Sequence, residues 1–227
     1  ITKNTVQETL VIPLYGRKMC SERYPALYRD ETAIRLIDQI DYDFAALEKK
    51  SGGLMQRFGV LEAAMRQTDL AFEVRDYLKT HPNAAVVNLG CGLDDTAWFS
   101  RIDTSGGAVF FAAGVFYYFL KEQVRALVQQ MAEAFPGGVL VFDAANEKAV
   151  RLMLKTWIKD AAIQDVGAYF AVADARRELS AWDSRLHVSS RGYMLGYNDL
   201  KDPSVSGFFR FLSRIGDNRM NMQIVKI

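Results

Sequence analysis

A short apolar strand that runs into a glycine turn is the feature that most constrains the fold of this chain. Val86-Val87-Asn88-Leu89 suits a buried parallel strand, and Gly90-Cys91-Gly92 follows it directly. A turn at the carboxyl end of the first strand of an open α/β sheet usually holds a nucleotide-like cofactor. Asp95 stands where the dinucleotide fingerprint has its third glycine, which favours an adenosyl cofactor such as S-adenosylmethionine over a dinucleotide. An ordinary strand-to-helix connection is the alternative.

Composition and charge exclude several classes of protein. With 227 residues and half of them apolar, the chain can form one large α/β domain. A net charge of +1 gives no basic footprint for nucleic acid. The apolar run 108–120 is shorter than the roughly 20 residues that a membrane span requires. Cys20 and Cys91 lack metal-ligand spacing and suit reduced thiols. We therefore expect a cytoplasmic protein without metal, nucleic-acid partner or membrane partner.

The order of elements predicts two units, a helical extension over 1–80 and an α/β core over 81–227. Asp30 is placed to cap a helix, and an apolar strand is expected within 10–18. We expect further helices over 61–79, 121–134, 148–160 and 175–181, and strands over 86–89, 108–112, 139–143, 169–172, 208–212 and 223–227. A mostly parallel sheet that ends in an antiparallel strand fits this order.

The connection after the first strand is unusually short. About fifteen residues separate Gly92 from the next predicted strand, whereas one parallel crossover alone takes a dozen or more. A doubly wound fold would place another strand and its crossover here. We therefore expect a segment to be absent between Asp103 and Thr104; a genuinely shortened fold is the alternative.

Several segments are similar, in the same order, to motifs of one family. They are LVIPLYGR (10–17), IDYDF (40–44), EVRDYL (73–78), VVNLGCGLD (86–94), AAGVFYYF (112–119) and FPGG (135–138). Through them the chain resembles the leucine carboxyl methyltransferase family, in the branch with the tetracenomycin-type polyketide O-methyltransferases. The resemblance implies a Rossmann-like fold, S-adenosylmethionine as cofactor, and methyl transfer to a carboxylate or hydroxyl of a small molecule such as a polyketide. It also implies that the absent segment holds roughly fifty residues, among them the acidic residue that binds the ribose.

Two departures from the family pattern favour an alternative function. Asp95-Thr96 stands where the family usually has Thr-Arg, and Ala113 stands where it often has Glu beside the cofactor. The alternative is a non-catalytic binding protein that keeps the fold. A nicotinamide oxidoreductase is a third hypothesis, disfavoured by the missing third glycine.

The resemblance places the cofactor on the glycine turn. Gly90, Cys91 and Gly92 would lie under the adenosine and methionine parts of the cofactor, and Asn88 would orient the turn. Asp94 would accept from the cofactor ammonium or, alternatively, cap the following helix.

Further cofactor contacts are expected from two other places. Ala112, Ala113 and Gly114 end a predicted strand, where small residues leave room for the sulfonium. Arg66 matches a family arginine that binds the cofactor carboxylate, for which a two-pronged guanidinium is suited. A solvated helix arginine is the alternative.

Substrate contacts are expected from two pairs of residues, one near the start of the chain and one after the strand predicted over 108–112. Tyr15 and Lys18 are expected to line the cofactor or an acidic substrate group, and Tyr117 and Tyr118 to shape the substrate pocket. Surface positions for the first pair and core positions for the second are the alternatives. The pattern offers no clear general base, so no catalytic residue is assigned.

Overall fold

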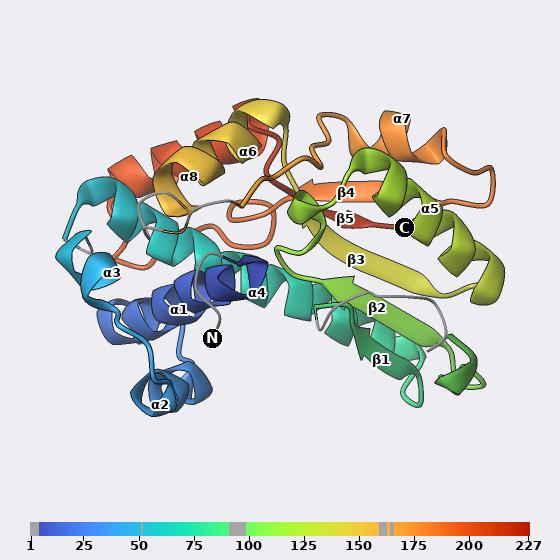
Figure 1. Cartoon of the computed structure of the whole chain (residues 1–227), viewed down its shortest axis with the longest axis horizontal. Helices are drawn as coiled ribbons and strands as arrows, with labels where there is room; N and C mark the ends of the chain where they lie inside the picture. The colour runs from blue at the N-terminus through green and yellow to red at the C-terminus, as the bar shows by residue number, and fades with distance from the viewer. Residues whose placement is uncertain (1–4, 51, 91–98, 159–162, 164–165) are drawn as a thin grey trace.

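The computed structural model describes residues 5–50, 52–90, 99–158, 163 and 166–227, which form a mixed five-stranded sheet with helices on both faces (Figure 1). In spatial order the strands are β1 (Ala85–Asn88), β2 (Ala108–Ala112), β3 (Val139–Ala144), β5 (Gln223–Lys226) and β4 (Ser189–Gly192). The first three run parallel, and β5 lies antiparallel to both β3 and β4. The α/β class is confirmed, and this mixed sheet is compatible with a Rossmann-like fold.

Alternation along the strands divides the core between the two faces of the sheet. Val109 and Val141 face α4 (Leu54–Thr80), while Phe110 and Phe142 face α5 (Lys121–Ala134), because successive strand residues point to opposite sides. The first face is also covered by α6 (Glu147–Met153) and α8 (Gly207–Arg219), and the second by α7 (Ala175–Ser180). The 3₁₀ helices η2 (Phe99–Arg101) and η3 (Phe116–Tyr118) complete this part.

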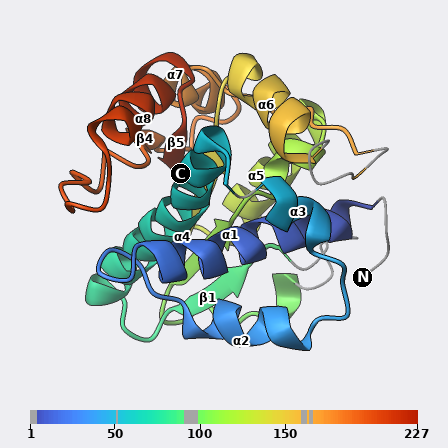
Figure 2. The ribbon, with the colours of Figure 1, turned by 90° about the vertical axis from the view of Figure 1, so that its left-hand side faces the viewer.

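The N-terminal helices are the 3₁₀ helix η1 (Val6–Leu10), α1 (Val11–Arg23), α2 (Glu31–Gln39) and α3 (Ala45–Lys50). Of these, α1 packs against α4, and η1 and α2 pack against α1 (Figure 2). The side chain of Asp30 accepts a hydrogen bond from the backbone N–H of Ala33 at 2.8 Å, so the predicted cap of α2 is confirmed. The division of the chain into units at residue 80 stays a prediction.

The strand predicted within 10–18 is wrong, because this segment forms most of α1. Val11, Leu14 and Tyr15 are buried at helical spacing, which an apolar run this short does not distinguish from a strand. Pro13 lies in the first turn of α1, where a missing N–H costs no helical hydrogen bond. At Gly16 a Cβ would lie 3.4 Å from the Cβ of Ala63, so the small residue lets α1 approach α4 closely.

Other predicted elements differ in the structure, among them the helix expected over 61–79, which begins earlier, at Leu54. Residues 208–212 lie in α8 and not in a strand, and the Ser206 side chain caps that helix. Residues 169–172 form no strand; the Val172 N–H instead donates to the Ala145 carbonyl. The helix predicted over 148–160 is present as α6, which passes into one π-helical turn, η4 (Leu154–Ile158); residues 159 and 160 lie outside the described residues. The helices and strand predicted over 121–134, 175–181 and 223–227 are confirmed within one residue.

Strand β1 forms one edge of the sheet and pairs with β2 alone in the described structure. Its side chains alternate between half-buried and exposed, and Val86 is 46% exposed. Apolar strands of parallel sheets are usually covered, so this exposure is compatible with a segment being absent after Asp103. The absence of that segment stays a prediction. None of the helices in the described ranges is long and apolar enough to cross a membrane.

Candidate functional site

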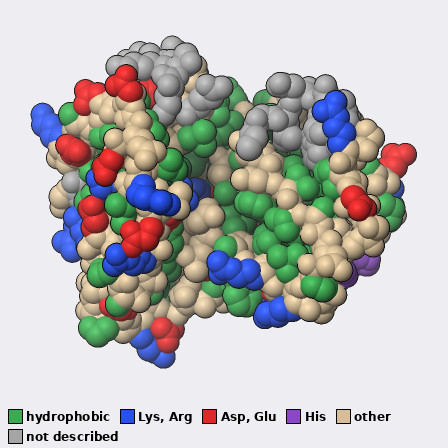
Figure 3. All heavy atoms as spheres, turned by 90° about the horizontal axis from the view of Figure 1, so that it is seen from below, with side chains coloured by type: hydrophobic (Ala, Val, Ile, Leu, Met, Phe, Trp, Pro, Cys, Tyr) green, Lys and Arg blue, Asp and Glu red, His purple; other side chains and the backbone are tan. Residues whose placement is uncertain are grey.

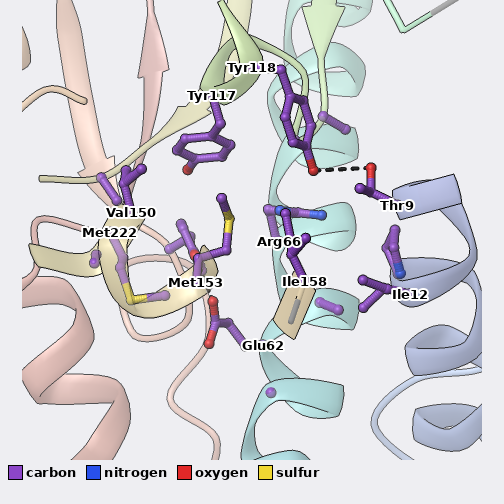
Figure 4. A pocket seen from close by; sticks show the side chains of 18 of the residues that line it. Thr9, Ile12, Glu62, Arg66, Tyr117, Tyr118, Val150, Met153, Ile158 and Met222 are labelled. Atoms are coloured by element: carbon purple, nitrogen blue, oxygen red, sulfur yellow. Dashed lines mark hydrogen bonds between the residues drawn. The ribbon is translucent and has the colours of Figure 1, made fainter. Parts of the chain in front are cut away.

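A cavity of about 120 Å³ lies beyond the carboxyl ends of β2 and β3 (Figure 4). Its walls come from α4, from α6, from the residues that follow β2, and from η1 with the start of α1. Ligands of open α/β sheets bind at this edge. On the outer surface, Figure 3 shows a hollow, lined in part by hydrophobic side chains, between the helices α1 to α3 and the strands β1 and β2.

A buried ion pair crosses the cavity wall. The guanidinium of Arg66 on α4 lies 3.2 Å from Asp143 at the end of β3, and the other oxygen of Asp143 accepts the Gly114 N–H at 2.6 Å. The Asp143 side chain is 1% exposed, whereas that of Arg66 is 20% exposed. Burial lowers the pKa of Arg66, but Asp143 together with Tyr193, Tyr117 and Glu62 outweighs it, so that the pKa is raised. The arginine therefore stays charged and keeps part of its surface open to the cavity.

Because Gly114 has no side chain, it leaves space for the guanidinium of Arg66. Its φ of +68° lies in the left-handed region that side chains disfavour. A Cβ there would lie 3.3 Å from both terminal nitrogens of Arg66. Ala113 also lines the cavity, whereas Ala112 is buried on the opposite face of the sheet, against the α5 side. Of the three small residues predicted to surround the sulfonium, the structure brings two to the cavity.

A second acidic group lies one helical turn before Arg66. Glu62 on α4 lines the cavity, and the Tyr193 hydroxyl donates to its Oε1 at 3.0 Å. Burial raises the pKa of Glu62 to about 7, although the Tyr193 hydrogen bond and the charge of Arg66 act in the opposite direction. Burial also raises the pKa of the Tyr193 hydroxyl well above 10, so this tyrosine acts as a neutral donor.

Tyr117 and Tyr118 both line the cavity, as predicted for the substrate pocket. The Tyr118 hydroxyl donates to Thr9 Oγ1 at 3.1 Å and so joins the end of β2 to the N-terminal helix (Figure 4). Burial raises the pKa of Tyr117 well above 10, with the Asp143 carboxylate adding to the shift. Both phenols therefore offer neutral hydroxyl groups and apolar ring faces.

Tyr15 and Lys18 are not brought to the cavity. Tyr15 stacks on Phe44 with ring centroids 5.7 Å apart, and the Lys18 ammonium lies 3.7 Å from Asp38 on α2. The reason is the helical form of α1, which directs Ile12 into the cavity and these two side chains toward its neighbours.

The glycine turn is described only at its start. The Asn88 side chain accepts the Gly90 N–H at 3.0 Å and so holds the first residue of the turn. Cys91, Gly92 and Asp94, all predicted cofactor contacts, lie outside the described residues.

Three residues of the site are not among those predicted from the sequence: Glu62, Asp143 and Tyr193. For two of them the sequence contains a pattern that could have indicated a role in the site. Glu62 lies four residues before Arg66, on the same face of a predicted helix, and Asp143 ends a buried strand at the ligand-binding edge. For Tyr193 there is no such pattern, because it comes from a distant loop after β4.

The fold and the cavity together define an α/β protein with a charged pocket at the carboxyl edge of its parallel strands. No protein-family model matches the chain. Over 93 residues it is 30% identical to the tetracenomycin polyketide synthesis O-methyltransferase TcmP of Streptomyces glaucescens. The match covers 41% of this chain and 32% of that protein, so the chain spans about a third of the length of this relative. This similarity supports a methyltransferase-like relationship.

Proposed function

We propose that this protein is an S-adenosylmethionine-dependent O-methyltransferase that acts on a small molecule. The observation that carries the proposal is the Arg66–Asp143 pair, held in a cavity at the carboxyl ends of parallel strands. The partial similarity to a polyketide O-methyltransferase supports the same reaction class.

The residues of the cavity fit the proposed cofactor. Arg66 has a partly exposed guanidinium, which suits the carboxylate of the cofactor's methionine part. Gly114 and Ala113 leave space beside it, and Asn88 holds the start of the glycine turn. When bound, S-adenosylmethionine supplies an electrophilic methyl group.

The protein contributes orientation and exclusion of water. Asp143 fixes Arg66 through a hydrogen bond from one side and is itself fixed by the Gly114 N–H, so the guanidinium has little freedom to move. The rings of Tyr117 and Tyr118 close the cavity at the end of β2. Aligning the acceptor oxygen with the methyl group converts the transfer into an effectively unimolecular step.

A non-catalytic binding protein is the second candidate, and Ala113 is the observation that favours it. Ala113 lines the cavity without a carboxylate, at the position where the family that the chain resembles often has Glu. A protein of this kind would bind the cofactor without transferring its methyl group to any acceptor.

Calorimetric titration with S-adenosylhomocysteine, with NAD as the control, tests the proposal. We expect micromolar or tighter binding of S-adenosylhomocysteine and none of NAD. The variant Arg66→Gln should weaken that binding at least tenfold, whereas Lys18→Gln, outside the cavity, should leave it unchanged. A folded protein that binds neither compound would overturn the cofactor assignment. Binding without transfer across an acceptor screen would favour the second candidate.

A further inference from the structure

A second cavity adjoins the first. This groove of about 420 Å³ lies between the start of α4, α6 and α8. Both cavities are lined by the same five residues, namely Gly59, Glu62, Ala149, Met153 and Met222. The two spaces are therefore neighbours with a common wall, and Glu62 belongs to both.

The volumes of the two cavities suggest that they bind different molecules or parts of molecules. Sites for small organic ligands measure about 300 to 1,000 Å³, so the inner cavity of about 120 Å³ has room for one end of such a molecule, such as the methionine part of the proposed cofactor, and not for a second whole molecule. The groove falls within this range. A molecule seated there would place one end against the common wall, at Glu62.

The lining of the groove is apolar and adaptable. Leu54 and Met55 are more than half exposed at its edge, and Leu212, Met220 and further methionines line it. Methionine side chains adjust to apolar surfaces of varied shape and make favourable contacts with aromatic rings. Among the described residues that line the groove, Glu62 is the one charged group.

The charges at the common wall discriminate between acceptor groups. Arg66 lies beyond this wall, paired with Asp143 and, in the proposed function, bound to the cofactor carboxylate. Glu62 is therefore the charged group of the wall, and the Tyr193 hydroxyl donates to one of its oxygens. Above pH 7, where Glu62 is ionised, a carboxylate acceptor placed against it would meet a like charge in a poorly solvated place, which is unfavourable. A hydroxyl there would donate a hydrogen bond to the Glu62 carboxylate instead.

We infer that the groove between α4, α6 and α8 holds the methyl acceptor, and that this acceptor is a mainly apolar molecule presenting a hydroxyl, not a carboxylate, to Glu62. The inference rests on the proposed function. As the acceptor oxygen forms its bond to the methyl carbon, the bond from that carbon to sulfur breaks and its electron pair stays on sulfur. The hydroxyl proton passes to the Glu62 carboxylate. A pKa near 7 suits a group that accepts a proton at neutral pH.

A matched pair of probes tests the inference by binding alone. 2-Naphthol and 2-naphthoate share an apolar body and differ in the polar group. By fluorescence titration of the full chain we expect 2-naphthol to bind at least tenfold more tightly than 2-naphthoate. Glu62→Gln should reduce this preference to less than threefold, while the same change at the exposed Glu22 should leave it intact.

A second variant locates the site. Leu212 lines the groove but not the inner cavity, so Leu212→Trp should weaken 2-naphthol binding at least tenfold and leave S-adenosylhomocysteine binding unchanged. The inference is overturned if neither probe binds, if 2-naphthoate binds as well as 2-naphthol, or if Leu212→Trp binds both ligands like wild type. The proposed function fails by a different result: the wild-type protein binds 2-naphthol but does not bind S-adenosylhomocysteine.

Discussion

At the scale of single residues, the site depends on how closely Gly114, Arg66 and Asp143 fit together. The backbone N–H of Gly114 and the guanidinium of Arg66 bind the two oxygens of one carboxylate. That carboxylate is almost fully buried, so its two donors replace the water that it loses on folding. A change at any of the three residues leaves the other two with an incomplete set of partners.

Gly114→Ala tests this fit, and Gly137→Ala is its matched control. Both glycines have a positive φ, of +68° and +76°, but a Cβ at Gly137 meets nothing within 4 Å. We expect Gly137→Ala to lower the free energy of unfolding by about 1 kcal/mol through backbone strain alone. Gly114→Ala should lower it further and weaken S-adenosylhomocysteine binding, because the added methyl presses on Arg66. Urea unfolding measures the first effect and calorimetry the second; equal losses in the two variants would contradict the contact.

Asp143→Asn tests how much the Arg66–Asp143 ion pair contributes to the free energy of unfolding. The variant leaves a mostly buried guanidinium without its carboxylate, which should cost about 2 kcal/mol once the partial exposure of Arg66 is considered. Glu147→Gln is the control, since it removes one partner of an exposed ion pair with Arg151 and should cost less than about 1 kcal/mol. Equal midpoints of urea unfolding for the two variants would show that the buried pair is no stronger than a surface pair.

The raised pKa of Glu62 predicts how stability changes with pH. Its pKa rises from 4.5 to about 7 on folding, so between these values the folded state holds a proton that the unfolded chain has released. The free energy of unfolding therefore falls as pH rises through this window, and Glu62 contributes about 2 to 3 kcal/mol of that fall. Glu62→Gln carries no such proton. Urea unfolding at pH 5 and pH 8 should show a smaller fall for the variant than for wild type, and parallel curves would contradict the prediction.

At the scale of elements, predictions were correct where the apolar pattern was long and where Pro or Gly residues marked the end of the element. The helix 121–134 repeats its apolar positions over several turns and ends at Pro136-Gly137-Gly138, so it was predicted to the residue. Short apolar runs were misread. Phe208 to Leu212 reads equally as a strand or as part of a helix, and only its contacts with α4 and the neighbouring loops decide between them.

The cap of α8 tests why that segment is helical. The Ser206 side chain accepts the Phe209 N–H at 3.2 Å. Ser206→Ala should lower the free energy of unfolding by about 1 kcal/mol, because the Phe209 N–H loses its side-chain acceptor and keeps only the Ser206 carbonyl. Ser206→Asp keeps an acceptor at the same place and should restore most of the loss in thermal or urea unfolding. A loss of similar size for both variants would show that another contact of Ser206 matters more.

At the scale of the whole molecule, the candidate site is assembled from distant parts of the chain. Its charged groups come from the middle of α4 and the end of β3, its small residues follow β2, and Tyr193 follows β4. Sequence patterns and the family resemblance identified Arg66, Gly114 and the two tyrosines after β2. They did not reveal the partners of Arg66 and Glu62, because those partners depend on how strands and helices converge in space.

The exposed edge of the sheet predicts self-association. Among the described residues, strand β1 has a partner strand on one side only, and open edges of this kind can recruit strands from other molecules. Val86→Lys should reduce the concentration-dependent light scattering of the protein. Val6→Lys changes a valine of nearly the same exposure, 47% against 46%, in a 3₁₀ helix and should have little effect. A comparable effect of both variants would point to general surface hydrophobicity and not to the edge of β1.

The position of β5 has a consequence for the time course of folding. This strand follows every other described element along the chain, yet it lies between β3 and β4 and bonds to both. Its Lys226 also reaches back to Glu73 on α4, with 3.3 Å between the charged atoms. During synthesis, α4 and the parallel strands leave the ribosome before β5 does. In the described sheet β4 pairs with β5 alone, so β4 can join the sheet only after β5 has been made.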